Sequence, residues 1–184
     1  MIERALKRAL GHMTHGVQVV ACAEDGVVRG FTCTWVCQVS FEEPVLAVSV
    51  SPKHDTYPMI ERQGWMTISV LAGDQVEEGQ YFSYPGRRFR HLGDYFDEVD
   101  GKPVVRDCIV WMYAEVVERH PTPDHVLFLV RVVATGEGRL DEPALTYSSR
   151  RGWRVAGPPA RHPGESVRDR LLRRLDEDQS GGET

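Results

Sequence analysis

Residues 31–45 read FTCTWVCQVSFEEPV, and the pattern of this stretch decides which class of fold the chain adopts. From position 31 to position 36, apolar or cysteine side chains alternate with a second set that begins with the hydroxyls of Thr32 and Thr34. Alternation with a period of two is typical of a β-strand that packs one face on a core. The opposite face of this strand would then carry the two hydroxyls.

Similar β-rich runs lie on both sides of this stretch and are joined by turns. Residues 16–23 are followed by an acidic, glycine-containing turn at residues 24–26 and by a second run over residues 27–39. Two such runs around a short turn predict a hairpin. A second hairpin is expected from residues 108–118 and 125–134, because a turn with two prolines separates them.

The remaining expected elements are short. Residues 83–106 contain Gly, Pro, Arg, aromatic and acidic residues without periodicity, which indicates a long irregular excursion of a kind that is often functional. Further strands are expected at residues 45–50, 65–71, 144–148 and 153–156, and short helices at residues 57–63 and 74–82. Six or seven strands joined mostly by turns favour a mainly β fold, an antiparallel barrel, over alternating strands and helices.

The length of the chain and the composition of its two ends predict one domain. With 184 residues, 41% of them hydrophobic, the chain can bury one core. Residues 1–16 predict an amphipathic helix, with Ile2, Leu6 and Leu10 on one stripe and without the continuous apolar run of a signal peptide. A C-terminal helix is expected near residues 167–175 and a disordered tail at residues 180–184. We therefore expect one domain over residues 1–157 and a linker, helix and tail over residues 158–184.

The charge of the chain restricts its partners. A formal net charge of -5 argues against a nucleic acid or an anionic membrane surface, since either would require a basic face. No stretch approaches the roughly 20 apolar residues that cross a bilayer. We expect a cytoplasmic protein.

The four cysteines, Cys22, Cys33, Cys37 and Cys108, raise the question of a metal. If Cys33 and Cys37 lie on one strand, they are separated by roughly 13 Å at about 3.3 Å per residue. That separation is too large for two ligands of one tetrahedral zinc ion. We expect buried, reduced thiols and no metal.

A junction between a strand and a short helix, residues 51–56, carries groups that a phosphate prefers. Ser51 and Thr56 supply hydroxyls, Lys53 supplies a cation, and a helix start supplies backbone N–H groups. A loop in which Asp55 or Thr56 only caps the helix would have the same sequence. On these residues alone the capping loop is the simpler interpretation.

The hydroxyl face of residues 31–36 suits a flavin ring, which requires polar atoms at its pyrimidine edge and an apolar surface at its benzenoid side. A half-exposed strand on which threonines are simply good β formers would show the same alternation. Periodicity does not choose between these interpretations.

Three segments of the chain resemble the flavin reductase-like family, the FMN-binding split barrels. They are THGVQVV at residues 14–20, GFTCTWVCQVSFEEPVLAV at residues 30–48 and DHVLF at residues 124–128. The resemblance covers most of the chain. It implies a mainly β, FMN-binding split β-barrel, antiparallel and Greek-key-like, with short helices.

The resemblance also implies which residues bind the ligand. In the family the central strand and the turn after it line the isoalloxazine ring, which by matched position implies Thr32, Cys33, Thr34, Trp35, Gln38, Val39 and Ser40. The loop after the next strand holds the phosphate, which implies Ser51, Lys53 and Thr56. A later Gly-Arg segment of the family is similar to Gly86, Arg87 and Arg88, so that Arg87 and Arg88 would add positive charge.

Two further positions are matched to the family. Many members carry Gly-Asp-His near the nicotinamide where this chain has Pro123, Asp124 and His125, which implies a catalytic role for His125. A histidine that only opens a strand is the alternative. Trp35 resembles the flavoredoxin-type branch, whose members keep FMN bound and pass electrons on, although a tryptophan that fills the barrel core would also fit.

Three functions follow from the resemblance. The first is an oxidoreductase that accepts hydride from NADH or NADPH and passes electrons to free flavin, ferric iron or a protein partner such as a monooxygenase. The second is a non-enzymatic carrier with fixed FMN, and the third is a split barrel that binds another ligand, such as a deazaflavin or haem.

The resemblance further implies the cofactor and the assembly state. FMN is the expected cofactor, with FAD as the alternative. Backbone N–H groups around residues 38–40 are expected to stabilise negative charge on the reduced ring. A homodimer is expected, because split barrels of this kind resemble obligate dimers and because pairing would protect exposed β edges.

Overall fold

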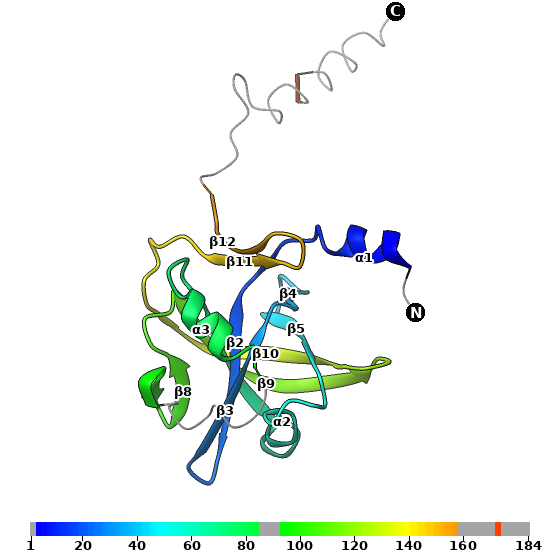
Figure 1. Ribbon diagram of the computed structural model, residues 1–184. Helices are drawn as coiled ribbons and strands as arrows, with labels where there is room; N and C mark the ends of the chain where they lie inside the picture. The colour runs from blue at the N-terminus through cyan, green and yellow to red at the C-terminus, as the bar shows by residue number, and fades with distance from the viewer. Residues whose placement is uncertain (1–2, 85–92, 158–171, 174–184) are drawn as a thin grey trace, which may run out of the picture.

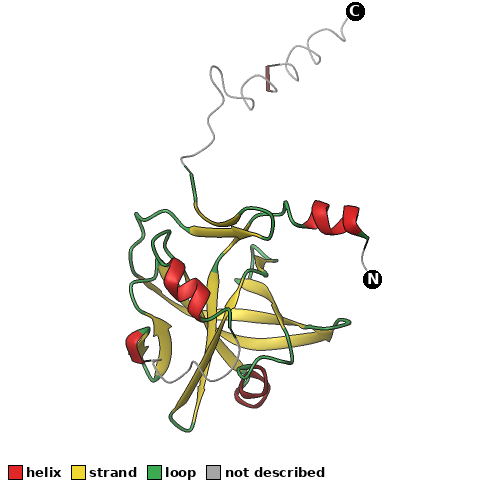
Figure 2. Ribbon diagram, viewed as in Figure 1, coloured by secondary structure: helices red, strands yellow, loops and turns green. Residues whose placement is uncertain are grey.

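The computed structural model of the chain describes residues 3–84, 93–157 and 172–173. Strands dominate the described residues, as Figure 2 shows, and confirm the mainly β fold expected from the sequence. The helices are α1 (Arg4–Leu10), α2 (Tyr57–Gln63) and α3 (Val76–Tyr81). The strands are β1 (His15–Gly16), β2 (Gln18–Glu24), β3 (Val27–Cys33), β4 (Val36–Gln38), β5 (Val45–Val50), β6 (Trp65–Val70), β7 (Phe96–Val99), β8 (Lys102–Val105), β9 (Val110–Pro121), β10 (Val126–Glu137), β11 (Leu145–Ser148) and β12 (Gly152–Val155).

Seven strands form one antiparallel sheet in the order β3-β2-β6-β9-β10-β5-β4. This order places β3 and β4 at opposite edges, although only Thr34 and Trp35 separate them in the chain. Three Cα–Cα steps bridge at most about 11 Å, whereas seven strands of a flat sheet spread over about 29 Å. The sheet therefore has to curl until its edges meet, which gives the barrel of Figure 1.

We call residues 34 and 35, where the two edges meet, the barrel seam. The Ser49 backbone N–H donates to the Trp35 carbonyl over 3.1 Å and holds this segment against β5. The Cys33 thiol donates to the Ser49 carbonyl over 3.7 Å from the other side of the seam. These two hydrogen bonds hold the seam against Ser49 of β5.

Two apolar clusters stabilise the fold. The first lies inside the barrel and includes Phe128, Met66 and, from α2, Ile60. The second lies between the main sheet, α3 and the smaller sheets, and includes Leu71 and Leu145. Burial of each such side chain contributes about 1.5–3 kcal/mol to folding.

Two smaller sheets complete the structure. Strands β1, β11 and β12 form one of them, and β7 pairs with β8 in the other. Backbone hydrogen bonds from the Val17 N–H to the Leu145 carbonyl and from the Leu71 N–H to the Val17 carbonyl tie the three-stranded sheet to the barrel, each over 3.0 Å. Figure 1 shows α1 beside this sheet, away from the closed part of the barrel.

The structure corrects the expectation of one continuous strand over residues 27–39. Strand β3 ends at Cys33 and pairs with β2, whereas β4 begins at Val36 and pairs with β5. The inward-facing positions change phase at this break: Phe31 and Cys33 are buried, Trp35 is exposed, and Val36 packs against the core in its place, although the sequence alternates without interruption. Periodicity alone therefore did not reveal the change of partner.

The expectation of an irregular excursion over residues 83–106 was wrong for its second half. Strands β7 and β8 form a hairpin whose turn residues, Asp100 and Gly101, have φ angles of 50° and 74°. Two successive positive φ angles in a two-residue Asp-Gly turn are typical of type I′ hairpins. Val104 and Val105 of this hairpin are buried in the second apolar cluster, so the segment is part of the core.

Other expectations had mixed outcomes. The long hairpin of β9 and β10 is confirmed and extends to Glu137. Three cysteines are buried and free as expected, but Cys37 is exposed, because it lies on the short edge strand β4. The helix expected at residues 167–175 and the tail lie outside the described residues apart from residues 172–173, so the boundary at residue 157 stays a prediction. Within the described ranges, no helix is long and apolar enough to cross a membrane.

Candidate functional site at the barrel seam

Trp35 of the seam is open to solvent. It is 53% exposed, so the interpretation of Trp35 as a filler of the barrel core is wrong. Its ring centroid lies 5.1 Å from that of His125, with 59° between the two ring planes. The His125 Nδ1 atom lies 2.9 Å from an Asp124 carboxylate oxygen, and the His125 backbone N–H donates to the Thr122 hydroxyl over 3.2 Å. The structure thus brings together two site residues that are 90 positions apart in the sequence.

Two cavities open beside the seam. The larger, of about 640 Å³, is lined by Trp35 and Thr34 and, from distant parts of the chain, by Leu10 and Tyr147. The smaller, of about 370 Å³, is lined by Thr32 together with Thr34 and Tyr147. Because Thr34 and Tyr147 line both cavities, the hydroxyl face expected from the sequence forms one continuous wall.

The two threonines of this wall differ in what they offer a ligand. The Thr32 hydroxyl donates to the Gly79 carbonyl over 2.7 Å and is already engaged. The Thr34 hydroxyl forms no hydrogen bond with any residue that the structure describes. Thr34 is therefore the member of the pair whose hydroxyl is available.

Cys33 lies on the other face of β3. It is buried in the first apolar cluster, and burial raises the pKa of its thiol to about 12. A thiol in this position is protonated at neutral pH and does not line either cavity. Of the expected ring-binding residues, Cys33 could contribute only through its backbone.

The turn after β4 is largely engaged in its own hydrogen bonds. The Gln38 side-chain amide donates to the Ser40 carbonyl over 2.9 Å, and the Ser40 hydroxyl accepts from the Glu43 N–H over 3.3 Å. The Val39 N–H donates to the Val45 carbonyl over 3.0 Å. The expected charge stabilisation by backbone N–H groups of residues 38–40 therefore cannot use the N–H of Val39.

The turn at residues 51–56 has the groups expected for a phosphate site, at different depths. Lys53 is exposed, and its backbone N–H donates to the Ser51 hydroxyl over 3.4 Å. Thr56 is only 1% exposed, and its hydroxyl has no hydrogen-bond partner within the described chain. Thr56 stands at the N-cap of α2 without a side-chain capping bond, so the capping-loop interpretation is wrong for this residue. A buried hydroxyl without a partner costs free energy, and a ligand could satisfy it.

His54, in the same turn, was missed by the sequence analysis. Its imidazole stacks on Phe31, with the ring centroids 4.3 Å apart and 17° between the planes. Burial lowers the pKa of His54, and a positive charge on His125 lowers it further, against a smaller opposite effect of Asp55. A histidine between the expected phosphate-binding residues was a visible signal, but only the fold shows that it is close enough to His125 for the two charges to interact.

Arg87 and Arg88, the other expected phosphate ligands, lie outside the described residues. No group of three or more His, Cys, Asp or Glu residues in the described chain could hold a metal ion.

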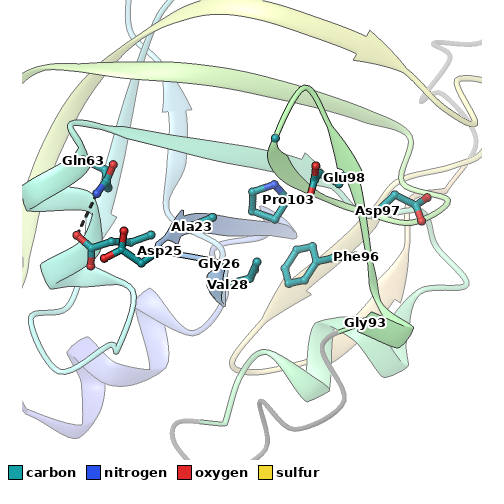
Figure 3. Close-up of a pocket in the computed structure, with 12 residues that line it drawn as sticks. Ala23, Asp25, Gly26, Val28, Gln63, Gly93, Phe96, Asp97, Glu98 and Pro103 are labelled. Carbon is teal, nitrogen blue, oxygen red and sulfur yellow. Dashed lines mark hydrogen bonds between the residues drawn. The ribbon is translucent and has the colours of Figure 1, made fainter.

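A third cavity, shown in Figure 3, differs from the seam cavities because it is lined by several carboxylates. It has a volume of about 430 Å³ and lies between the turns of the β2–β3 and β7–β8 hairpins, with Phe96 and Pro103 on its walls. Glu24, which accepts a hydrogen bond from Gln63 over 3.0 Å, is one of four carboxylates that line it. Phosphate groups would be repelled by these carboxylates, and none of the expected site residues that the structure describes lines this cavity.

The seam fits a ligand that combines a planar ring with a phosphate. Trp35 offers an aromatic face, Thr34 offers a hydroxyl, and the neighbouring turn offers a cation and an unsatisfied buried hydroxyl. These are the groups that a flavin mononucleotide requires.

Comparison with known proteins gives a consistent result. Residues 10–154 match the family model described as the flavin reductase like domain. An NADH-dependent flavin reductase of Rhodococcus sp. is 32% identical over 130 residues, which cover 69% of this chain and 73% of the relative. The reductase component of a 4-hydroxyphenylacetate 3-monooxygenase from Thermus thermophilus is 30% identical over 159 residues, which cover 85% of this chain and 99% of the relative.

The fold is similar to that of solved structures. The flavin reductase domain protein from Arthrobacter sp. FB24 superposes with a TM-score of 0.78 at 22% identity, over 88% of this chain and 99% of that one. At this identity the similarity shows the fold alone. Because the family model covers most of the described barrel and both seam residues, the chain belongs to the flavin reductase-like family.

Proposed function

We propose that the protein is a flavin reductase that oxidises NADH at the barrel seam. The observation that supports this proposal is the continuous wall of Thr32, Thr34 and Trp35 along two adjoining cavities, with His125 against Trp35. The Rhodococcus relative is an NADH-dependent enzyme, which favours NADH over NADPH.

Each side chain of the seam has a role in this proposal. A bound flavin, FMN or FAD, would supply the chemistry of hydride acceptance and electron release. Trp35 covers the ring, and the Thr34 hydroxyl bonds to its polar edge. His125 positions the nicotinamide, and Ser51, Lys53 and Thr56 hold the phosphate. No side chain has to transfer a proton for the hydride to move.

The electron acceptor is the second part of the proposal. The Thermus relative is the reductase component of a monooxygenase, so we propose that this protein supplies reduced flavin to a flavin-dependent monooxygenase in the cytoplasm. Free flavin would then be both the product released and the carrier between the two proteins. Ferric iron is a further acceptor to be tested.

A carrier with permanently bound FMN is the alternative function. It is favoured by the exposed indole of Trp35, because a large aromatic surface at the ring would slow the loss of flavin. The two functions differ in whether the flavin leaves after reduction.

We also propose that the protein is a homodimer. Large apolar side chains are exposed both on α1, at Leu6 and Leu10, and after the seam, at Val39 and Phe41. Leu10 lines the same cavity as Trp35, so the exposed apolar surface of α1 adjoins the site. Burial of this surface against a second copy would remove it from water and add walls to the open cavities.

The proposed function is tested by steady-state kinetics on the purified protein. We expect the absorbance of NADH at 340 nm to fall only when FMN or FAD is added in excess, with a KM for the flavin. A protein that is purified with stoichiometric FMN and oxidises NADH without added flavin would be the carrier. A protein that binds no flavin and oxidises no NADH would contradict both functions.

A further inference from the structure

A basic pocket lies next to the larger seam cavity. It has a volume of about 270 Å³ and is lined by Arg4, Lys7 and Arg8 of α1 and by Arg150 of the turn between β11 and β12. Among the residues that the structure describes, no acidic one lines it. In a chain with a net charge of -5, four cations around one pocket are a local excess of positive charge.

The pocket is held by contacts between two distant segments. The Arg150 backbone N–H donates to the Gly11 carbonyl over 3.0 Å, which fixes the end of α1 against the β11–β12 turn. A Cβ atom at Gly11 would lie 2.9 Å from the Ser149 hydroxyl oxygen, so the Ser149 side chain packs closely on the backbone at the end of α1. The cations of both segments are thus brought together by the fold.

These cations have no partners among the described residues. In the part of the chain that the structure describes, Arg4, Lys7, Arg8 and Arg150 form no ion pair and no side-chain hydrogen bond. Elsewhere the structure pairs arginines with carboxylates, at Arg62, Arg106, Arg119, Arg131 and Arg139. Four unpaired cations around one pocket repel one another, and an anion in the pocket would relieve this repulsion.

The helix dipole explains only part of this pattern. Lys7 and Arg8 lie in the last turn of α1, where positive charge is favourable. Arg4 lies in the first turn, where it is unfavourable, and it is four residues from Arg8, a spacing at which like charges destabilise a helix. Arg150 is not part of the helix. An anion site accounts for all four residues.

The position of the pocket indicates the kind of anion. Lys7, Gly11 and Ser149 line both the basic pocket and the 640 Å³ cavity that contains Trp35. A molecule with a ring system in the cavity and a second phosphate-bearing half would therefore reach both. Adenine dinucleotides have this form.

We propose that Arg4, Lys7, Arg8 and Arg150 bind the ADP half of an adenine dinucleotide. The proposal rests on the proposed function, because it places the other half of the ligand in the seam cavity. The ADP half is common to FAD and NADH, and the experiment separates these two sources.

The test compares a double variant, Arg8→Gln with Arg150→Gln, with a control, Lys102→Gln, which removes a charge from β8 away from the pocket. Affinity for ADP is measured by calorimetric titration, without any need for activity. Affinities for FAD and FMN are measured by flavin fluorescence. KM values are measured for NADH and for reduced nicotinamide mononucleotide, which lacks the ADP half.

We expect the double variant to bind ADP at least tenfold more weakly, while Lys102→Gln binds it normally. A tenfold loss for FAD with unchanged FMN affinity would assign the pocket to the flavin. A tenfold rise in the KM for NADH with no change for the mononucleotide would assign it to the nicotinamide substrate. A double variant of Arg8→Lys and Arg150→Lys should restore part of the affinity.

The outcomes separate this proposal from the proposed function. Suppose that the double variant binds ADP as the parent does, that its affinities for FAD and FMN keep the same ratio, and that its KM values for NADH and the mononucleotide do so as well. The proposed role of the basic pocket would then be contradicted, even if the protein reduces flavin. Loss of ADP binding in a protein that reduces no flavin would support the pocket and contradict the proposed function.

Discussion

The imidazole of His54 lies nearly flat on the phenyl ring of Phe31, with the ring centroids 4.3 Å apart. Phe31 is the third residue from the end of β3, and His54 belongs to the turn at residues 51–56, so this contact joins the strand that leads to the seam with the expected phosphate turn. His125, which contacts Trp35, also lowers the pKa of His54 through the repulsion of like charges. The proposed ring site and the proposed phosphate site are thus electrostatically connected.

This arrangement predicts how His54 affects stability as the pH changes. Burial, and then His125, hold the pKa of His54 in the folded protein below its ordinary value of 6.5. Between the two values the unfolded chain binds a proton that the folded chain does not. The contribution of neutral His54 to the free energy of unfolding is therefore present above about pH 6.5 and is lost as the pH falls toward the folded-state pKa.

The matched variant for this prediction is His54→Gln, measured by urea unfolding between pH 5.5 and pH 8. The free energy of unfolding of the parent should fall more steeply below pH 6.5 than that of the variant. Equal slopes in this range would mean that His54 titrates in the folded protein as it does in the unfolded chain.

Thr56→Val tests the buried hydroxyl of the phosphate turn. Valine has nearly the same shape, and it removes a hydroxyl that has no partner in the described structure. The ligand-free variant should be more stable by about 1 kcal/mol, and its affinity for FMN should be lower. A ligand-free variant that is less stable would show that the hydroxyl has a partner in the free protein.

Lys53→Ala tests the cation of the same turn. Loss of one charge-assisted hydrogen bond to a phosphate should weaken FMN binding by about 1.5–3 kcal/mol. Riboflavin, which has no phosphate, is the internal control and should bind the parent and the variant equally. An equal loss for both ligands would place Lys53 at the ring, and no loss for either would leave Arg87 and Arg88 as the next candidates.

Phe41→Ser tests the proposed dimer. Phe41 is 98% exposed in the single chain, which is an unfavourable position for an aromatic ring unless another surface covers it. Light scattering at micromolar concentration should give twice the chain mass of 20.8 kDa for the parent and a lower mass for the variant. Val27→Ser, at an exposed apolar residue on the far hairpin turn, should leave the mass unchanged. A parent that is monomeric at this concentration would contradict the proposal.

Local signals in the sequence predicted a large part of the fold. Helix α2 has the expected bounds of residues 57–63, because Pro58 favours its first turn and Gly64, with a φ of 72°, ends it. The hairpin of β2 and β3 follows from Asp25 and Gly26, which both have positive φ. In each case the residues that decide the conformation are adjacent in the chain.

Features that depend on distant residues were missed or incomplete. The break at the seam is decided by the pairing of β4 with β5 rather than β2, and Cys37 is exposed for the same reason. Thr34 and Trp35 were predicted at the site, but the cavity also needs Leu10 and Tyr147, whose positions depend on the three-stranded sheet. The Asp100 and Gly101 turn did carry a local signal, which the surrounding irregular composition concealed.

Trp35 decides between a flavin that is held and a flavin that is released. About half of the residue is exposed beside the cavity, which for an indole is on the order of 100 Å². At about 25 cal/mol per Å², coverage of this area by a flavin ring would contribute about 2.5 kcal/mol to binding. Trp35→Ser should therefore weaken FMN binding by one to two orders of magnitude, with a matching rise in the rate of flavin release.

The measurement is the affinity and the dissociation rate of FMN in Trp35→Ser, with Trp65→Phe as the control. Trp65 packs on Tyr113 at a centroid distance of 5.7 Å and lines neither seam cavity, so its replacement should leave the flavin affinity unchanged. If the protein is a reductase, Trp35→Ser should keep its turnover with excess FMN but require more FMN to reach it. Equal affinity in Trp35→Ser and the parent would show that the indole does not cover the ring, and the case for a tightly held flavin would then lose its main structural support.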